Sequence, residues 1–179
     1  YFPVTDASEV NPAFYSTWNY TSEALRRKLA NVKGSSAITI GSQIGAWASG
    51  NHALDRQYVS TPMDSGISFS GVTVKCQIMA REYNNGDNTH SEMAARIVNR
   101  AGDTDRQVLL LVNSYGSGVE YLNNPSHRNA IFADGDVVTG TYTTVQRDRL
   151  IVEIGHRDTA GATPEGSCKF GENATDLPE

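Results

Sequence analysis

The sequence predicts one all-β domain, an antiparallel β-sandwich of jelly-roll type with an N-terminal extended arm and one short helix. Three observations lead to this fold class. Short segments alternate between apolar and polar residues, turns rich in Gly, Asn and Asp separate them, and the linkers are too short and too polar for the helices of a parallel α/β sheet. A length of 179 residues suits a single domain. We therefore expect residues 1–21 to form the arm and residues 22–179 the sandwich.

The first part of the chain carries the arm and the only helical pattern. Residues 1–21 contain prolines, asparagines and aromatic residues without a clean period, so we expect an extended arm on a surface or on a neighbouring chain. A helix is predicted over residues 22–32, since Ser22 can cap it and Gly34 offers a stop. The apolar residues on its face, at helical spacing, are Leu25, Leu29 and Val32.

After Gly34 the apolar period changes to two, which is typical of strands. The predicted strands cover residues 37–40, 72–78, 108–112, 137–143 and 150–154. Residues 72–78 alternate most clearly, and the continuous apolar run 108–112 suits a strand in the middle of a sandwich. Turn residues gather at 84–88, 123–125 and 134–136.

The charge balance and the hydropathy pattern exclude two kinds of partner. The formal net charge is −5, with 20 acidic and 15 basic residues, whereas a nucleic-acid binder normally shows a basic face. No apolar stretch approaches the roughly 18 residues that a membrane span needs. The chain starts at Tyr1 without Met, so we expect a processed or trimmed product whose targeting segment has been removed.

The two cysteines, Cys76 and Cys168, match no metal motif and form no CxxC pair. Two interpretations stay open. They are two buried free thiols, as lone cysteines often are. Alternatively, they form a long-range disulfide between two strands, which would indicate an oxidising compartment or an extracellular particle.

No residue pattern indicates catalysis. The histidines lie in polar stretches and are expected at the surface; they are His52, His90, His127 and His156. Neither HExxH nor a GxSxG turn occurs. Alternation predicts that Glu153 faces solvent, away from the core, and Asp148 is expected to pair with the adjacent Arg149. We therefore expect that the protein is not an enzyme and that no residue is catalytic.

Loops and aromatic residues supply only weak binding candidates. Residues 85–88 and 134–136 carry spaced oxygen ligands of the kind that calcium uses, but turn preference also explains them. We expect no metal site and no cofactor, with calcium as the alternative. Trp18, Trp47 and Tyr115 are candidate contacts to a glycan or a partner, because aromatic rings stack on sugars. A tryptophan packed on the core edge is the alternative.

A further pattern extends over most of the chain. It comprises residues 12–14, Trp18, residues 26–29, 45–47 and 54–60, Pro62, and residues 148–155, 170–171 and 176–179. In these residues the sequence resembles a group of jelly-roll-like proteins of phages and of uncultured microbes. The resemblance implies a component of a virus particle, such as a capsid decoration, neck or tail protein. In that group the chain continues beyond residues 176–179 into one more strand, so we expect a trimmed or disordered tail, or an edge completed by another chain.

Together these observations predict a non-enzymatic structural component of a virus particle or of an extracellular filament. It would self-associate through the arm and the sheet edges. Its partners would be further copies of the chain, other virion or filament proteins, and in one alternative glycans. Its location would be the virion or the extracellular space. The alternatives are a carbohydrate- or receptor-binding module and a glycan-active enzyme on a sandwich scaffold. The enzyme would need two converging carboxylates, or a His beside a Tyr, in one cleft.

Overall fold

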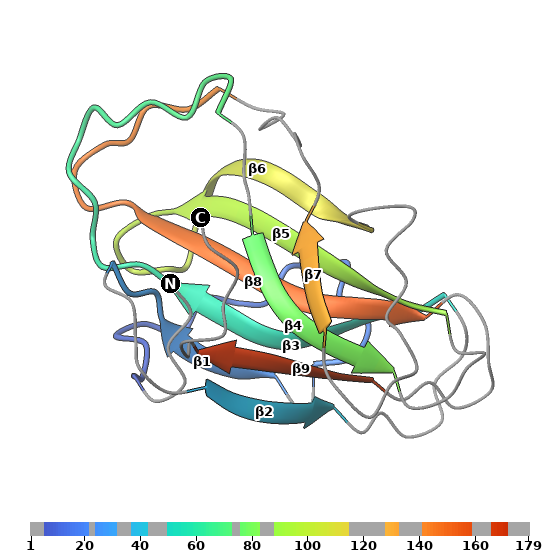
Figure 1. Cartoon of the computed structure of the whole chain (residues 1–179). Coiled ribbons are helices and arrows are strands. Elements are labelled where there is room, and N and C mark those ends of the chain that lie inside the picture. Colours follow the sequence, from blue (N-terminus) through green and yellow to red (C-terminus); the bar gives the residue numbers. More distant parts are fainter. Residues whose placement is uncertain are drawn as a thin grey trace.

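The computed structural model describes residues 6–21, 24–31, 37–42, 50–72, 76–82, 88–114, 128–132, 141–158 and 166–171. These residues form nine strands and no helix (Figure 1). The strands are β1 (Leu25–Lys28), β2 (Ala37–Ser42), β3 (His52–Val59), β4 (Cys76–Glu82), β5 (Thr89–Val98), β6 (Asp105–Ser114), β7 (Arg128–Phe132), β8 (Arg149–Asp158) and β9 (Gly166–Gly171). The predicted all-β class is confirmed. No helix among the described residues is long and apolar enough to cross a membrane.

The strands make two sheets. The five-stranded sheet has the order β1-β3-β8-β5-β6, and the four-stranded sheet has the order β2-β9-β4-β7. In the five-stranded sheet β1 runs parallel to β3, and every other pair is antiparallel. That sheet is therefore mixed, and the prediction of purely antiparallel strands is wrong for it. The strand β8 lies at its centre, between β3 and β5.

The helix predicted over residues 22–32 is wrong, because its middle forms the strand β1. A helix of this length is marginal without tertiary contacts, and the contacts here favour an extended chain. The Arg26 side chain donates to Gln57 Oε1 at 2.8 Å and to the Pro12 carbonyl at 3.1 Å, and the backbone pairs with β3. Leu25 stays 43% exposed, so the expected apolar helix face is not buried.

Three strand predictions are confirmed, since residues 37–40, 108–112 and 150–154 fall within β2, β6 and β8. The central position expected for residues 108–112 is not found among the described strands, where β6 is the terminal strand of its sheet. Of the predicted strand 72–78, residues 76–78 fall within β4, whereas Val72 lies outside any strand and is 37% exposed; residues 73–75 lie outside the described residues. In the predicted strand 137–143, Thr143 makes an isolated bridge to Ser68.

Two long strands, β3 and β5, were not predicted from the sequence, because both contain charged residues. Every residue of β3 from Ala53 to Val59 is nevertheless buried. In β5 the burial extends from Ser91 to Val98. Buried charges persist only when they are paired and hydrogen-bonded. The partners of these charges come from distant parts of the chain, as described below.

Both faces of the five-stranded sheet are buried at its centre. On one face lie side chains that are at most 1% exposed: Tyr58, Met93, Ile97 and Ile154. On the other face Val59, Val98 and Ile151 pack against Val10, and Trp18 packs with Leu54 and Ala94. Since Val10 and Trp18 belong to the predicted arm, the arm supplies the cover of this second face.

An irregular two-stranded ribbon projects beyond the sheet, formed by residues 60–72 and 141–148 (green and orange at the upper left of Figure 1). Phe69 N donates to the Tyr142 carbonyl at 2.8 Å, and Thr144 N donates to the Ile67 carbonyl at 2.9 Å. Val145 is 51% exposed on this ribbon. The ribbon ends where Asp148 leads into β8.

Candidate functional site: the arm-side face of the central sheet

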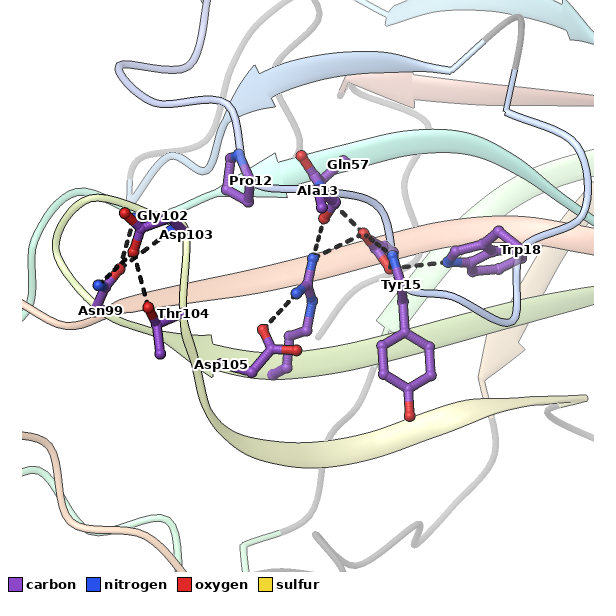
Figure 2. Close-up of polar contacts among 12 residues, drawn as sticks. Pro12, Ala13, Tyr15, Trp18, Gln57, Asn99, Gly102, Asp103, Thr104 and Asp105 are labelled. Carbon is purple, nitrogen blue, oxygen red and sulfur yellow. Dashed lines mark hydrogen bonds and ion pairs between the residues drawn. The ribbon is translucent and has the colours of Figure 1, made fainter.

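The described part of the arm, residues 6–21, lies across one face of the five-stranded sheet of its own chain, here termed the arm-side face (Figure 2). At its start the Asp6 carbonyl accepts from Lys28 N of β1 at 2.8 Å. At its end Asn19 N donates to the His52 carbonyl at 2.8 Å, and Tyr20 bridges to Ala53. Both ends are therefore attached to the sheet by main-chain hydrogen bonds.

Glu153 is the centre of the contacts between arm and sheet. Its carboxylate is 1% exposed and accepts from Tyr15 N at 3.1 and 3.2 Å, one distance for each oxygen. Trp18 Nε1 donates to it at 2.9 Å, and Gln57 Nε2 donates at 2.7 Å (Figure 2). An Arg96 guanidinium nitrogen lies 3.5 Å away. Donors of the arm and of the sheet thus compensate the charge of Glu153.

Arg96 and Gln57 bind the main chain of the arm directly. The Ala13 carbonyl accepts from Gln57 Nε2 at 3.1 Å and also from Arg96. Arg96 is 6% exposed, and it additionally pairs with Asp105 at the rim of the sheet. Because these contacts are made to backbone atoms, the sheet holds the arm as an extended peptide.

The prediction of a solvated Glu153 is wrong. The alternation places it correctly on the face opposite Val152 and Ile154, but the arm covers that face. The sequence contains one sign of this burial. Alternation places Ile151 on the same face as Glu153, and an isoleucine on a face exposed to solvent is unexpected. Ile151 is 0% exposed, which confirms that both faces of β8 are buried.

The expected pair between Asp148 and Arg149 is also wrong. Asp148 accepts from the Tyr142 hydroxyl at 2.7 Å and from Val145 N at 2.9 Å, whereas Arg149 binds Glu9 of the arm at 2.9 Å. Asp148 is bonded within the projecting ribbon, whereas Arg149, the first residue of β8, binds the arm, so the two side chains have different partners. Burial, reinforced by the bond to Asp148, raises the pKa of Tyr142.

The histidines are not uniformly at the surface. His156 is 1% exposed and lies on the face opposite the arm, 3.0 Å from Asp55, so its predicted exposure is wrong. His52 Nδ1 lies 2.6 Å from a carboxylate oxygen of Glu92, and the His52 side chain is 21% exposed. His90 is half-buried. His127 lies outside the described residues.

Of the three predicted binding residues, Trp18 is the one that lies among the described residues. Trp18 is 6% exposed and uses its indole N–H on Glu153, so it lies in the core and presents no ring face to a glycan. Trp47 and Tyr115 lie outside the described residues, as do most of the two candidate calcium loops. In the parts of the chain that the structure describes, no group of three or more His, Cys, Asp or Glu side chains could hold a metal ion.

The strand register separates the two cysteines. Cys168 on β9 pairs with Ala80 on β4, and Cys76 lies four residues before Ala80. That offset corresponds to about 13 Å along an extended strand, whereas a disulfide joins Cα atoms at most about 7 Å apart. The register therefore does not favour a bond between Cys76 and Cys168 within one chain. Two free thiols stay the prediction.

No protein-family model matches the chain, and no curated protein sequence matches it. Among solved structures, a chain of infectious bursal disease virus, Gx strain, is similar over 80% of this chain and 33% of that chain. The two have 10% sequence identity and a TM-score of 0.25. The present chain thus spans about one third of the length of that viral chain. A TM-score this low does not define a common fold.

Proposed function

We propose that the protein is a non-enzymatic structural component of a virus particle, such as a capsid decoration, neck or tail protein, or of an extracellular filament. In this proposal the two sheets form a jelly-roll-type sandwich, and copies of the chain associate through sheet edges. The location is then the virion or the extracellular space. The resemblance in sequence to jelly-roll-like phage proteins motivates the assignment to a virus particle, and two features of the structure support a structural role.

The first support is the use of the buried charges. On the arm-side face Glu153 and Arg96 are bonded to the arm, and Glu92 is bonded to His52. Near the rim Arg149 binds Glu9 and two main-chain carbonyls. A catalytic carboxylate needs access to a substrate, whereas these groups attach one part of the chain to another. Their arrangement favours architecture over chemistry.

The second support is the burial of the face opposite the arm. Tyr58, Met93, Ile97 and Ile154 on that face are at most 1% exposed, so another layer covers them. A four-stranded sheet belongs to the same chain. Packing that sheet over this face would give a three-layer order of arm, five-stranded sheet and four-stranded sheet, which is a sandwich with an additional cover.

The observation that carries the proposed self-association is the strand β6. It has ten residues, Asp105–Ser114, and among the described strands it stands at the end of the order of its sheet. A long terminal strand is a template for strand addition, which natural proteins normally protect. The opposite terminal strand, β1, has four residues, and the arm already binds it through Lys28 N. We therefore propose that β6 is the associating edge and that the arm covers the sheet of its own chain.

The test combines sedimentation velocity, which measures the size of the assembly, with hydrogen–deuterium exchange of backbone amides. Sedimentation velocity over a wide concentration range should show reversible growth from monomer to homo-oligomer. Hydrogen–deuterium exchange of the assembled sample should then show amides of β6 that exchange more slowly than in the dilute sample. The strand β8 is the internal control, because it already has a neighbour on each side and its exchange should not change.

Two outcomes contradict the proposal. A monomer at every concentration, with no assembly seen by electron microscopy, would contradict self-association. Assembly with unchanged exchange in β6 would contradict the role of this edge. A specific hit on a glycan array with the monomeric protein would instead favour the carbohydrate-binding alternative.

A further inference from the structure

Three basic side chains form a row at one end of the arm-side face. The register pairs His52 of β3 with Arg157 of β8, and it pairs the same Arg157 with His90 of β5. Residues directly opposite one another on neighbouring strands project from the same face, with Cβ atoms about 4.5–5.5 Å apart. Arg157 is therefore flanked by an imidazole on each side.

Two of these side chains have buried polar atoms without a partner. Arg157 Nε and His90 Nδ1 are both inaccessible to solvent and make no hydrogen bond. Among the described residues, the structure shows no ion pair for the Arg157 guanidinium either. Buried polar atoms in folded proteins are normally hydrogen-bonded, and leaving one without a partner costs about 1–3 kcal/mol. Both atoms are donors or can become donors, so the group that would satisfy them is an acceptor.

The carboxylate of Glu92, beside His52, is already engaged. Glu92 is fully buried and lies 2.6 Å from His52 Nδ1, which orients that imidazole and leaves its Nε2 as the other bonding position. The side chains of His52 and Glu92 come from strands on either side of β8, and they approach each other next to Gly155, which pairs with Glu92. Trp18 of the arm closes this side, because a Cβ on Gly155 would lie 2.7 Å from Trp18 Cζ3.

Asn19 lies where the arm leaves the sheet beside this row, since its side-chain oxygen accepts from His52 N at 3.0 Å. The set of groups suits an anion rather than a cation. Arg157 stands between the two histidines and would repel a metal ion, and the guanidinium fork matches the oxygens of a carboxylate, phosphate or sulfate.

We propose that His52, His90 and Arg157 bind an oxyanion, either a free phosphate or sulfate ion or the acidic group of a sugar chain. The bound oxygens would accept from Arg157 and from the imidazoles, while Glu92 keeps the His52 ring in place. This site is independent of the proposed self-association through β6. Its residues belong to β3, β8 and β5, and it lies at the end of the face where the arm leaves the sheet.

The test follows the histidine side-chain resonances by NMR while an anion is added at constant ionic strength in a phosphate-free buffer. The probes are inorganic phosphate, inorganic sulfate, glucuronate and a sulfated disaccharide. Saturable shifts at His52 and His90 are expected with at least one probe. Arg157→Gln should weaken that binding at least tenfold. Arg147→Gln, which removes an exposed arginine of the projecting ribbon, is the matched control and should leave the affinity unchanged.

The outcomes separate the sources of the anion. Tighter binding of the acidic sugars than of the inorganic ions would identify a glycan, and equal affinities would identify a free ion. Shifts that do not saturate, or that Arg157→Gln and Arg147→Gln reduce equally, would overturn the site. If Arg157→Gln does not fold, His90→Gln serves as the second variant. It should weaken binding severalfold, and full affinity in it would equally overturn the proposal.

Discussion

Replacing Glu153 by glutamine tests whether the arm is part of the folded domain. The carboxylate accepts from three separate donors, on Tyr15, Trp18 and Gln57, and it lies 3.5 Å from Arg96. Glutamine has the same shape, but it offers one acceptor oxygen and directs an amide N–H₂ group toward the remaining donors. At least one buried donor therefore loses its partner, and the Arg96 guanidinium loses the buried one of its two carboxylate neighbours, while Asp105 remains.

The expected loss is large relative to the stability of a domain. A buried donor without a partner costs about 1–3 kcal/mol, and removing one partner of a buried ion pair costs about 3–5 kcal/mol. The two effects overlap because they concern the same carboxylate, so we expect Glu153→Gln to lower the free energy of unfolding by about 3–5 kcal/mol. Denaturant unfolding followed by circular dichroism measures this as a lower midpoint with an unchanged slope.

Glu9→Gln is the matched control, since Glu9 is a carboxylate of the arm that contacts Arg149 of the sheet, and its side chain is 49% exposed. Its pairing with Arg149 is screened by solvent, so its unfolding midpoint should change little. Chymotrypsin gives a second measurement, because cleavage after Phe14, Tyr15 or Trp18 requires the arm to leave the sheet. Glu153→Gln should accelerate that cleavage. A midpoint equal to that of Glu9→Gln, with unchanged cleavage, would refute the role of Glu153 in holding the arm.

Two further predictions follow from single contacts. Gly155→Ala should destabilise the protein by about 3 kcal/mol or more, because the added Cβ would collide with the carbonyl of Ala53 on the neighbouring strand. An unfolding midpoint equal to that of the wild type would contradict this. Hydrogen bonds from Asn99 and then Thr104 lower the pKa of Asp103. Their contribution to stability is therefore fully present at pH values above the ordinary pKa of an aspartate, and it is lost as the pH falls through the lowered pKa of the folded state. Asn99→Ala should move the pKa of Asp103, measured by carboxyl NMR titration, back toward its usual value, and an unchanged titration would argue against the contact.

The sequence predicts those strands whose buried residues are apolar. Residues 150–154 and 108–112 are apolar and form strands in β8 and β6. β3 was not recognised because Asp55, Arg56 and Gln57 interrupt its apolar residues, yet all three are at most 5% exposed. Their partners are far away in sequence. Asp55 is bonded to His156, more than one hundred residues later, and no local pattern indicates such a pair.

The wrongly predicted helix has a different cause. The spacing of Leu25 and Leu29 is compatible with a helix, and nothing between residues 24 and 31 prevents it. Local preference in so short a segment is worth only a few tenths of a kcal/mol per residue. Parallel pairing with β3 and the bonds of Arg26 to Pro12 and Gln57 outweigh it, because they satisfy backbone and side-chain groups together.

The candidate sites could not be derived from the sequence because they arise from the arm. A two-residue period identifies which side chains share a face of the sheet, but it does not show whether that face is exposed to solvent or covered. Once residues 6–21 cover it, Glu153 becomes a buried carboxylate that holds Trp18, and the same cover ends beside His52, where the row continues with Arg157 and His90. One segment thus accounts for both features. Where it lies on the sheet, its backbone and indole compensate the charges, and where it leaves the sheet lie the basic groups for which we propose an oxyanion.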